Sequence, residues 1–134
     1  MCGNDTEIKR TEFVMKSYTD LEQSKKLSEI LSIESADMCF NISQRYNMPP
    51  LMTPYSKFNE FFNMEKTPDF LIPCWSLAAL LNILPYPSLH KTFSGWRCDS
   101  YNKEGTSCIL GVPADNPVDA CYEMILKLHE LNLL

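Results

Sequence analysis

The longest apolar run in the chain covers residues 72–84, and it predicts a buried helix. Its apolar side chains surround a helical wheel instead of forming one stripe, so packing partners are needed on more than one side. Pro73 suits the first helical position, and Pro85 prevents continuation of the helix. We therefore expect a central helix over residues 73–84. The run is too short to span a bilayer, which takes about 20 apolar residues.

Two further segments have the spacing of amphipathic helices. Thr19 and Glu22 match a capping box and predict a helix over residues 20–32. Asn116 and Pro117 mark the start of a second helix over residues 117–131. The apolar face of this last helix is expected to consist of Val118, Cys121, Met124, Ile125, Leu128 and Leu131.

Residues 88–112 lose the helical period and contain turn signals, which predicts two or three short strands. The segment from Asn102 to Gly105 has the composition of a hairpin loop with glycine in the left-handed position. In that register Cys98 faces Leu110, and Cys108 faces Ser100. Strand alternation sends one set of side chains to the core, namely Trp96, Cys98 and Ser100, and the other set outward, namely Arg97, Asp99 and Tyr101.

The rest of the chain is less regular. Residues 1–17 are mostly polar and predict a flexible tail, with a short edge segment as the alternative. Residues 33–69 contain several prolines and predict an irregular insertion. Thr53 and Pro54 predict a short helix over residues 54–64 with an aromatic face made of Tyr55, Phe58, Phe61 and Phe62. Together these elements predict an α+β fold. We expect a single domain over residues 1–134, with three main helices packed around a small antiparallel β-hairpin sheet.

Charge and composition narrow the choice of partner and compartment. The 134 residues carry a formal net charge of −5, which opposes a phosphate backbone, so direct binding to nucleic acid is not expected. The polar start of the chain does not resemble a signal peptide, and no run is long enough for a membrane span. We therefore expect a cytoplasmic protein with six reduced cysteines, which are Cys2, Cys39, Cys74, Cys98, Cys108 and Cys121.

Motifs that would identify a reaction are absent from the sequence. The histidines and cysteines do not have the spacing of metal ligands, and the four glycines form no phosphate-binding loop, so we assign no metal and no cofactor. Cys98, with His90 and His129 as distant bases, is the candidate nucleophile of a cysteine-dependent enzyme. Alternation points Cys98 away from its charged neighbours Arg97 and Asp99. A non-enzymatic protein is therefore expected, with the cysteine enzyme ranked third among three functions.

The outward set of the predicted hairpin is the first candidate for a binding site. Arg97 and Tyr101 place a guanidinium and an aromatic ring on one face, a combination enriched where proteins bind partners. Asp99 lies between them, and Lys103 adds positive charge at the turn. The alternative is a surface ion pair of Arg97 with Asp99, with Tyr101 lying over the sheet edge. A second candidate patch is the aromatic segment with Tyr55, Phe58 and Phe62. The alternative is that these rings close one side of the core.

Three segments, 18–27, 72–81 and 116–121, resemble a group of small uncharacterised proteins encoded by phages and mobile elements of gut bacteria. These three segments comprise 26 of the 134 residues. The order of helix, central helix, hairpin and final helix is more remotely similar to the phage α-β-α sandwich domain. The group supplies no activity or catalytic residue.

The resemblance implies a protein that binds a host protein and so antagonises a host defence system. The alternative is a protein that sequesters a small anionic ligand, such as a nucleotide signal. Its pocket would lie between the protomers of a homodimer, lined by Arg97 and Tyr101.

Overall fold

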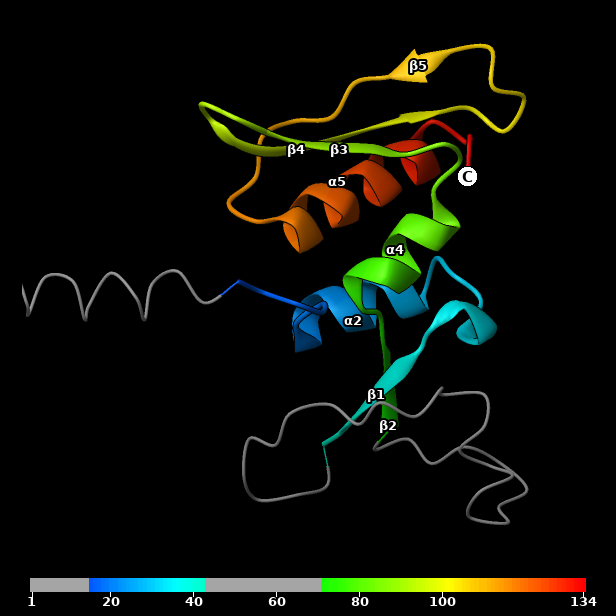
Figure 1. Ribbon diagram of the computed structural model, residues 1–134. Coiled ribbons are helices and arrows are strands. Elements are labelled where there is room, and N and C mark those ends of the chain that lie inside the picture. Colours follow the sequence, from blue (N-terminus) through cyan, green and yellow to red (C-terminus); the bar gives the residue numbers. More distant parts are fainter. Residues whose placement is uncertain (1–14, 43–70) are drawn as a thin grey trace, which may run out of the picture.

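The fold is α+β, as the sequence predicts (Figure 1). The computed structural model describes residues 15–42 and 71–134. These residues contain three α-helices and two antiparallel sheets. The elements are, in order, α2 (Leu21–Ser28), a 3-10 turn (Ile33–Ser35), β1 (Met38–Asn41), β2 (Leu71–Cys74), α4 (Leu77–Ile83), β3 (Ser88–Thr92), β4 (Gly95–Tyr101), β5 (Cys108–Ile109) and α5 (Pro117–Glu130).

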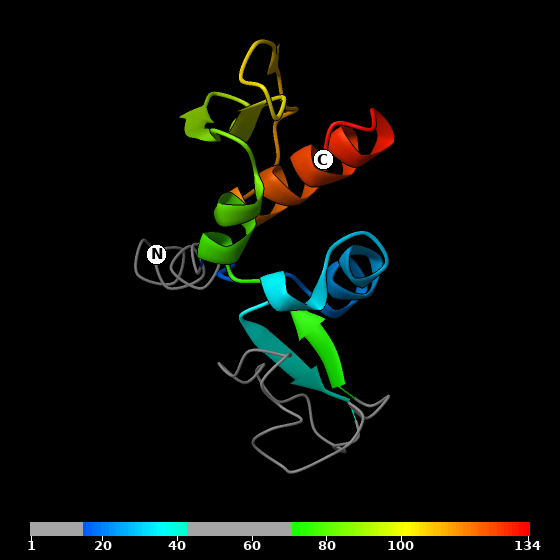
Figure 2. The same cartoon turned by 90° about the vertical axis from the view of Figure 1, so that its right-hand side faces the viewer.

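The two sheets lie at opposite ends of the molecule, with the helices between them (Figures 1 and 2). The larger sheet has the strand order β3-β4-β5, and α5 packs against β4 and β3. Helix α4 contacts α5, and α2 packs on β2 of the two-stranded sheet. The expectation of three helices around one sheet is therefore wrong, because β1 and β2 form a second sheet that carries α2.

The central helix begins later than the sequence indicated. Pro73 lies in strand β2, where it pairs with Cys39 of β1. Proline is tolerated there because each strand of a two-stranded sheet has one side without a partner strand, and a missing N–H on that side breaks no hydrogen bond of the sheet. The helix starts after Ser76, whose hydroxyl accepts the N–H of Ala79 at 3.2 Å, and Asp37 in turn accepts bonds from Ser76.

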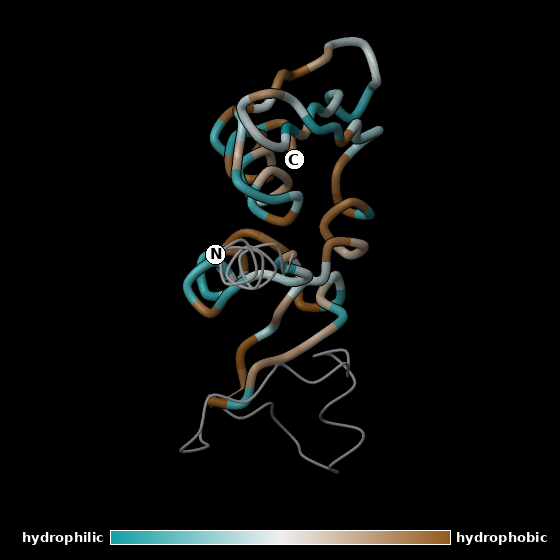
Figure 3. Tube along the Cα trace, turned by 60° about the vertical axis from the view of Figure 1, so that its left-hand side comes forward, coloured by the Kyte–Doolittle hydropathy of each residue, from teal (hydrophilic) through white to brown (hydrophobic). Residues whose placement is uncertain are grey.

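Helix α4 is also less enclosed than its composition suggests. Hydrophobic positions, coloured brown in Figure 3, follow this helix. Within α4, however, Leu80 is the one fully buried residue, and Ala78 and Asn82 are exposed. One side of α4 faces the core and α5, and the opposite side faces solvent. The prediction of a helix buried on all sides is wrong.

The first helix has its capping box one residue further along than predicted. Asp20 accepts the N–H of Gln23 at 2.8 Å, and the Gln23 side chain accepts the N–H of Asp20 at 3.1 Å. Thr19 is fully buried, and its hydroxyl accepts the N–H of Trp75 at 3.2 Å. Thr19 is therefore used by the core and cannot cap the helix, which ends at Ser28 instead of Ser32.

The last helix confirms its predicted start. Asn116 is the N-cap and accepts the N–H of Asp119 at 2.9 Å, and Pro117 occupies the first turn. The predicted apolar face is buried against the sheet and α4 except at its end. Leu131 follows the last helical residue, Glu130, and is 49% exposed, so its assignment to the buried face is wrong.

The strands differ from the predicted hairpin in register. A tight turn at Phe93 and Ser94, which the sequence analysis missed, joins β3 to β4. Beyond the loop that follows β4, Ser100 pairs with Ile109 and Tyr101 with Cys108, one residue away from the predicted register.

The partner segment of β4 also contains a β-bulge. Farther from the loop, Trp96 of β4 pairs with Ala114. The stretch from Ile109 to Ala114 therefore holds one more residue than the stretch of β4 from Trp96 to Ser100 that it faces. Gly111 lies in this bulged segment.

Candidate functional site

The outer face of the three-stranded sheet carries most residues of the first candidate binding site. Cys98 and Ser100 are fully buried, and Trp96 packs against the core that includes α5. Arg97 and Tyr101 lie on the opposite face, as alternation predicts, but Asp99, which was also expected to face outward, is buried. His90 of β3 joins them, because it pairs directly with Arg97.

Asp99 lies at the centre of this face but is not a free surface group. Its side chain is only 10% exposed, and Arg97 Nη2 donates to its Oδ2 at 3.2 Å. The N–H of Gly111 donates to its other oxygen at 2.9 Å. His90 Nε2 lies 3.6 Å from Asp99 Oδ2, too far for a hydrogen bond. Asp99 therefore ties the bulge to β4 and orients Arg97.

Two tyrosines form the aromatic part of the face. Tyr86 and Tyr101 meet edge to face, with ring centroids 6.4 Å apart and an angle of 87° between the rings. The Tyr101 N–H donates to the carbonyl of Pro85 at 3.1 Å, and this bond holds Tyr101 beside the turn that carries Tyr86. Tyr86 was not among the residues predicted from the sequence. The available signal was an aromatic residue between Pro85 and Pro87, in a turn that keeps it at the surface.

Beside the tyrosines lies a shallow depression of about 390 Å³ lined by Tyr86, Tyr101, Glu104 and Gly105. Asn102 organises the loop around it, because its Oδ1 accepts the N–H of Thr106 at 2.8 Å. Lys103 is exposed on the same loop but does not line the depression. The lining side chain that is charged at neutral pH is Glu104, and its charge opposes the binding of an anion there.

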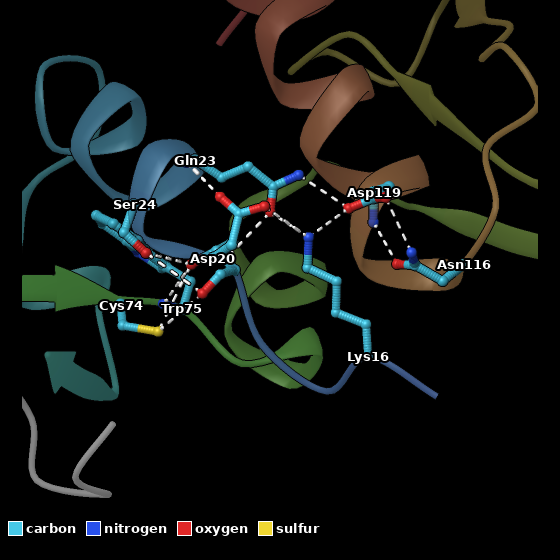
Figure 4. Close-up of polar contacts among 9 residues, drawn as sticks. Lys16, Asp20, Gln23, Ser24, Cys74, Trp75, Asn116 and Asp119 are labelled. Carbon is cyan, nitrogen blue, oxygen red and sulfur yellow. Dashed lines mark hydrogen bonds and ion pairs between the residues drawn. The ribbon is translucent and has the colours of Figure 1, made fainter. Parts of the chain in front are cut away.

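A second polar cluster, the clasp, consists of Lys16, Asp20, Gln23 and Asp119 (Figure 4). Lys16 Nζ donates to Asp119 Oδ1 at 2.8 Å, to the Gln23 side chain at 2.8 Å and to Asp20 at 3.0 Å. Gln23 Nε2 also donates to Asp119 Oδ1 at 2.8 Å. The clasp joins the start of α2 to the start of α5, and its donors and acceptors bind one another. These contacts therefore hold the two helix starts together.

The pKa values of the clasp follow from these contacts. Burial raises the pKa of Asp119, but hydrogen bonds from Lys16 and Gln23 and the charge of Lys16 more than offset it, so the pKa falls below its ordinary 3.8. Burial lowers the pKa of Lys16, but Asp119 and Asp20 outweigh it, so the pKa rises above 10.5. The clasp should therefore stabilise the fold fully above about pH 4 and below about pH 10.

Replacing Asp119 with Asn will lower the free energy of unfolding by about 1 to 2 kcal/mol at neutral pH, because Lys16 loses its charged partner. As the pH falls through the pKa of Asp119, protonation removes the same charge from the wild type, so the difference should shrink. Urea unfolding at several pH values measures both effects. Glu123→Gln, on an exposed position of α5, is the control and should change nothing. If the loss of stability in Asp119→Asn did not depend on pH, the ion pair of Lys16 with Asp119 would not be its cause.

The cysteines of the described residues are free thiols, and four of the five are buried. A hydrogen bond with Cys98, together with burial, raises the pKa of Cys121. Burial also raises the pKa of Cys39 and of Cys74. Cys98, the candidate nucleophile, has no exposed surface. A substrate would reach its sulfur only if the contact between β4 and α5 opened.

The second candidate patch, with Tyr55, Phe58 and Phe62, lies outside the described residues, as does the predicted helix 54–64. Within residues 15–42 and 71–134, no group of three or more histidine, cysteine or acidic side chains could hold a metal ion. The same residues contain no helix long and apolar enough to cross a membrane. Comparisons with protein-family models, curated proteins and solved structures gave no match to this chain.

Proposed function

We propose that this chain is a non-enzymatic protein-binding module and that its contact surface is the outer face of the three-stranded sheet. The observation that carries the proposal is the conformation of Tyr86. This residue has a φ of 47° and is 70% exposed. Left-handed backbone costs a non-glycine residue about 1 to 2 kcal/mol, and here little of the side chain is buried in return. A partner that covers Tyr86 explains why a tyrosine occupies the turn.

The neighbours of Tyr86 have the composition of a protein contact surface. Tyrosine and arginine dominate the binding energy of protein interfaces, and here Tyr86 and Tyr101 flank a face that also presents Arg97. Leu110 and Phe93, which directly follow β5 and β3, add exposed apolar area. Arg97 is held in place by Asp99, so less side-chain entropy is lost when a partner binds.

The resemblance to proteins of phages and mobile elements supports a host protein as the partner, with antagonism of a host defence system as the consequence. The alternative, sequestration of a small anionic ligand, has less support. The depression beside Tyr86 is large enough for a small ligand, since such pockets start at about 300 Å³. Glu104 lines it, however, and its charge opposes a nucleotide.

Site-specific photo-crosslinking tests the contact surface. The chain is expressed in its own host with a benzoylphenylalanine in place of Tyr86 or, as a control, in place of Glu22 on the exposed side of α2. We expect a discrete protein adduct from position 86 that is absent from position 22. The same adducts from both positions, or none from position 86, would contradict the proposal.

Tyr101→Ala and Tyr86→Gly will each weaken binding to the crosslinked protein by about tenfold or more, because each removes an aromatic contact. Tyr86→Gly relieves the left-handed strain, so its stability should stay within about 1 kcal/mol of the wild type. Arg97→Ala is a poorer test, because it leaves the buried Asp99 without its cation. Isothermal titration measures the affinities. Normal binding by both tyrosine variants would make the segment with Tyr55, Phe58 and Phe62 the next candidate.

A further inference from the structure

We propose that strand β3 binds an extended, acidic segment of the partner protein by strand addition, so that the segment becomes a fourth strand of the sheet. This inference rests on the proposed function, since it names the part of the partner that the sheet recognises. Strand β3 is an edge of the β3-β4-β5 sheet. Among the described residues, no backbone group hydrogen-bonds to its outer side.

The direction of the free backbone groups follows from the pairing of Trp96. Its N–H and C=O both bond to Ala114, each at 2.7 Å, on the side of β4 away from β3. Lys91 pairs with Trp96 across β3 and β4. This pair is therefore of the non-hydrogen-bonded type, and the N–H and C=O of Lys91 point away from β4. By alternation those of Leu89 do so too, so the outer edge presents two donors and two acceptors in a row.

The opposite edge of the sheet is less suitable for strand addition. Strand β5 has only two residues, and the segment after it contains the bulge at Gly111. Lys127 Nζ also donates to the carbonyl of Leu110 at 2.7 Å, which occupies one backbone acceptor there. Bulges and very short edge strands of this kind protect sheet edges from pairing. Strand β3 instead keeps five consecutive pairs with β4 without a bulge.

Charge defines the chemistry of the partner segment. Residues 86–112 carry three basic side chains, Lys91, Arg97 and Lys103, against two acidic ones, although the whole chain has a net charge of −5. Strand β3 itself contains Lys91 and His90 and no acid. Carboxylates on an added strand would lie across from Lys91 or beside His90, where cross-strand pairs of opposite charge are favourable. A second copy of this chain would bring a second Lys91 and His90 to the same edge, which disfavours self-pairing.

A matched pair of variants at position 91 separates backbone pairing from charge. Lys91→Pro removes an N–H that points only to the free edge, so the sheet should remain folded while the edge loses a donor. Lys91→Ala removes the charge and keeps the N–H. The probe is a capped eight-residue peptide of alternating valine and glutamate, and the control peptide has lysine in place of glutamate. Nuclear magnetic resonance titration measures the affinities, and circular dichroism verifies that both variants are folded.

We expect the glutamate peptide to bind the wild type more tightly than the lysine peptide does. Lys91→Pro should bind the glutamate peptide about tenfold more weakly than Lys91→Ala, the effect of one lost hydrogen bond. The amide protons of Leu89 and Lys91 should exchange rapidly in the free protein and become protected when the peptide binds.

Several results would overturn the inference. Equal binding by Lys91→Pro and Lys91→Ala, or equal affinity for the two peptides, would exclude this edge or its charge preference. Slow exchange at Leu89 and Lys91 in the free protein would show that the edge is already paired, and sedimentation as a dimer that Lys91→Pro abolishes would identify a second copy as the occupant. If any of these results were obtained and position 86 still crosslinked to a protein, the inference would be wrong but the proposed function would hold. Peptide binding without that crosslinking would instead refute the proposed function alone.

Discussion

Replacing Leu80 with Ala will lower the free energy of unfolding by about 2 to 5 kcal/mol. Leu80 has no exposed surface and belongs to the core cluster that joins α4 to α5. Truncation loses the transfer free energy of the removed atoms and leaves a cavity, because Trp75 and the α5 side chains can close around it only in part. Chemical denaturation followed by circular dichroism measures the loss.

Leu131→Ala is the matched control for that experiment. The sequence pattern assigns Leu131 to a buried face, but the residue is 49% exposed after the end of α5. Its replacement should change stability by no more than about 0.5 kcal/mol. Comparable losses in the two variants would show that the C-terminus is more buried than described. A loss below about 0.5 kcal/mol in Leu80→Ala would place the core elsewhere.

The part of the fold that could be predicted is the part set by residues close together in the sequence. The start of α5 depends on Asn116 and Asp119, which bond to each other within a single turn, and on Pro117, which occupies that turn. The face of β4 that carries Arg97 and Tyr101 follows from strand alternation alone. In both cases no distant segment is needed to fix the outcome.

The second sheet could not be predicted for the opposite reason. The sequence of β2 was predicted to begin the apolar helix, because a short apolar run does not distinguish a helix from a buried strand. It becomes a strand because Leu71–Cys74 pairs with Met38–Asn41, a segment about thirty residues earlier in the chain. Thr19 illustrates the same effect, since its bond to Trp75 prevents it from capping α2.

The candidate site also has a part that could be predicted from the sequence and a part that could not. Sequence alternation placed Arg97 and Tyr101 together, but the burial of Asp99 depends on Gly111, which comes from the bulged segment. The loop after β4 closes at Asn102 and Ser107 instead of at Asn102 and Thr106, which explains the one-residue error in register near Tyr101. The bulge adds a further residue before the pairing at Trp96. Tyr86 joins the site through its contact with Tyr101, and hydrophobic spacing does not signal a contact of that kind.

Replacing Gly111 with Ala will destabilise the protein by about 3 kcal/mol, at the upper end of the range for overpacking. A methyl group at position 111 would overlap the carbonyl oxygen of Cys98, which belongs to the backbone of β4 and is not a movable side chain. The bulge would have to shift outward, and Asp99 would then lose the N–H that Gly111 donates at 2.9 Å. Urea unfolding measures the loss of stability, and the amide resonance of residue 111 reports the hydrogen bond.

Gly105→Ala provides the comparison that identifies the cause. Gly105 has a φ of 73°, so alanine is strained there, but the nearest atom to a new methyl group would be Tyr86 Cε2 at an ordinary 3.6 Å. That variant should lose only the strain of left-handed backbone, about 1 to 2 kcal/mol. Gly111 is not in the left-handed region, so its requirement for glycine comes from the close approach of two strands. If Gly111→Ala proves no more destabilising than Gly105→Ala, the bulge yields easily and does not hold Asp99 in place.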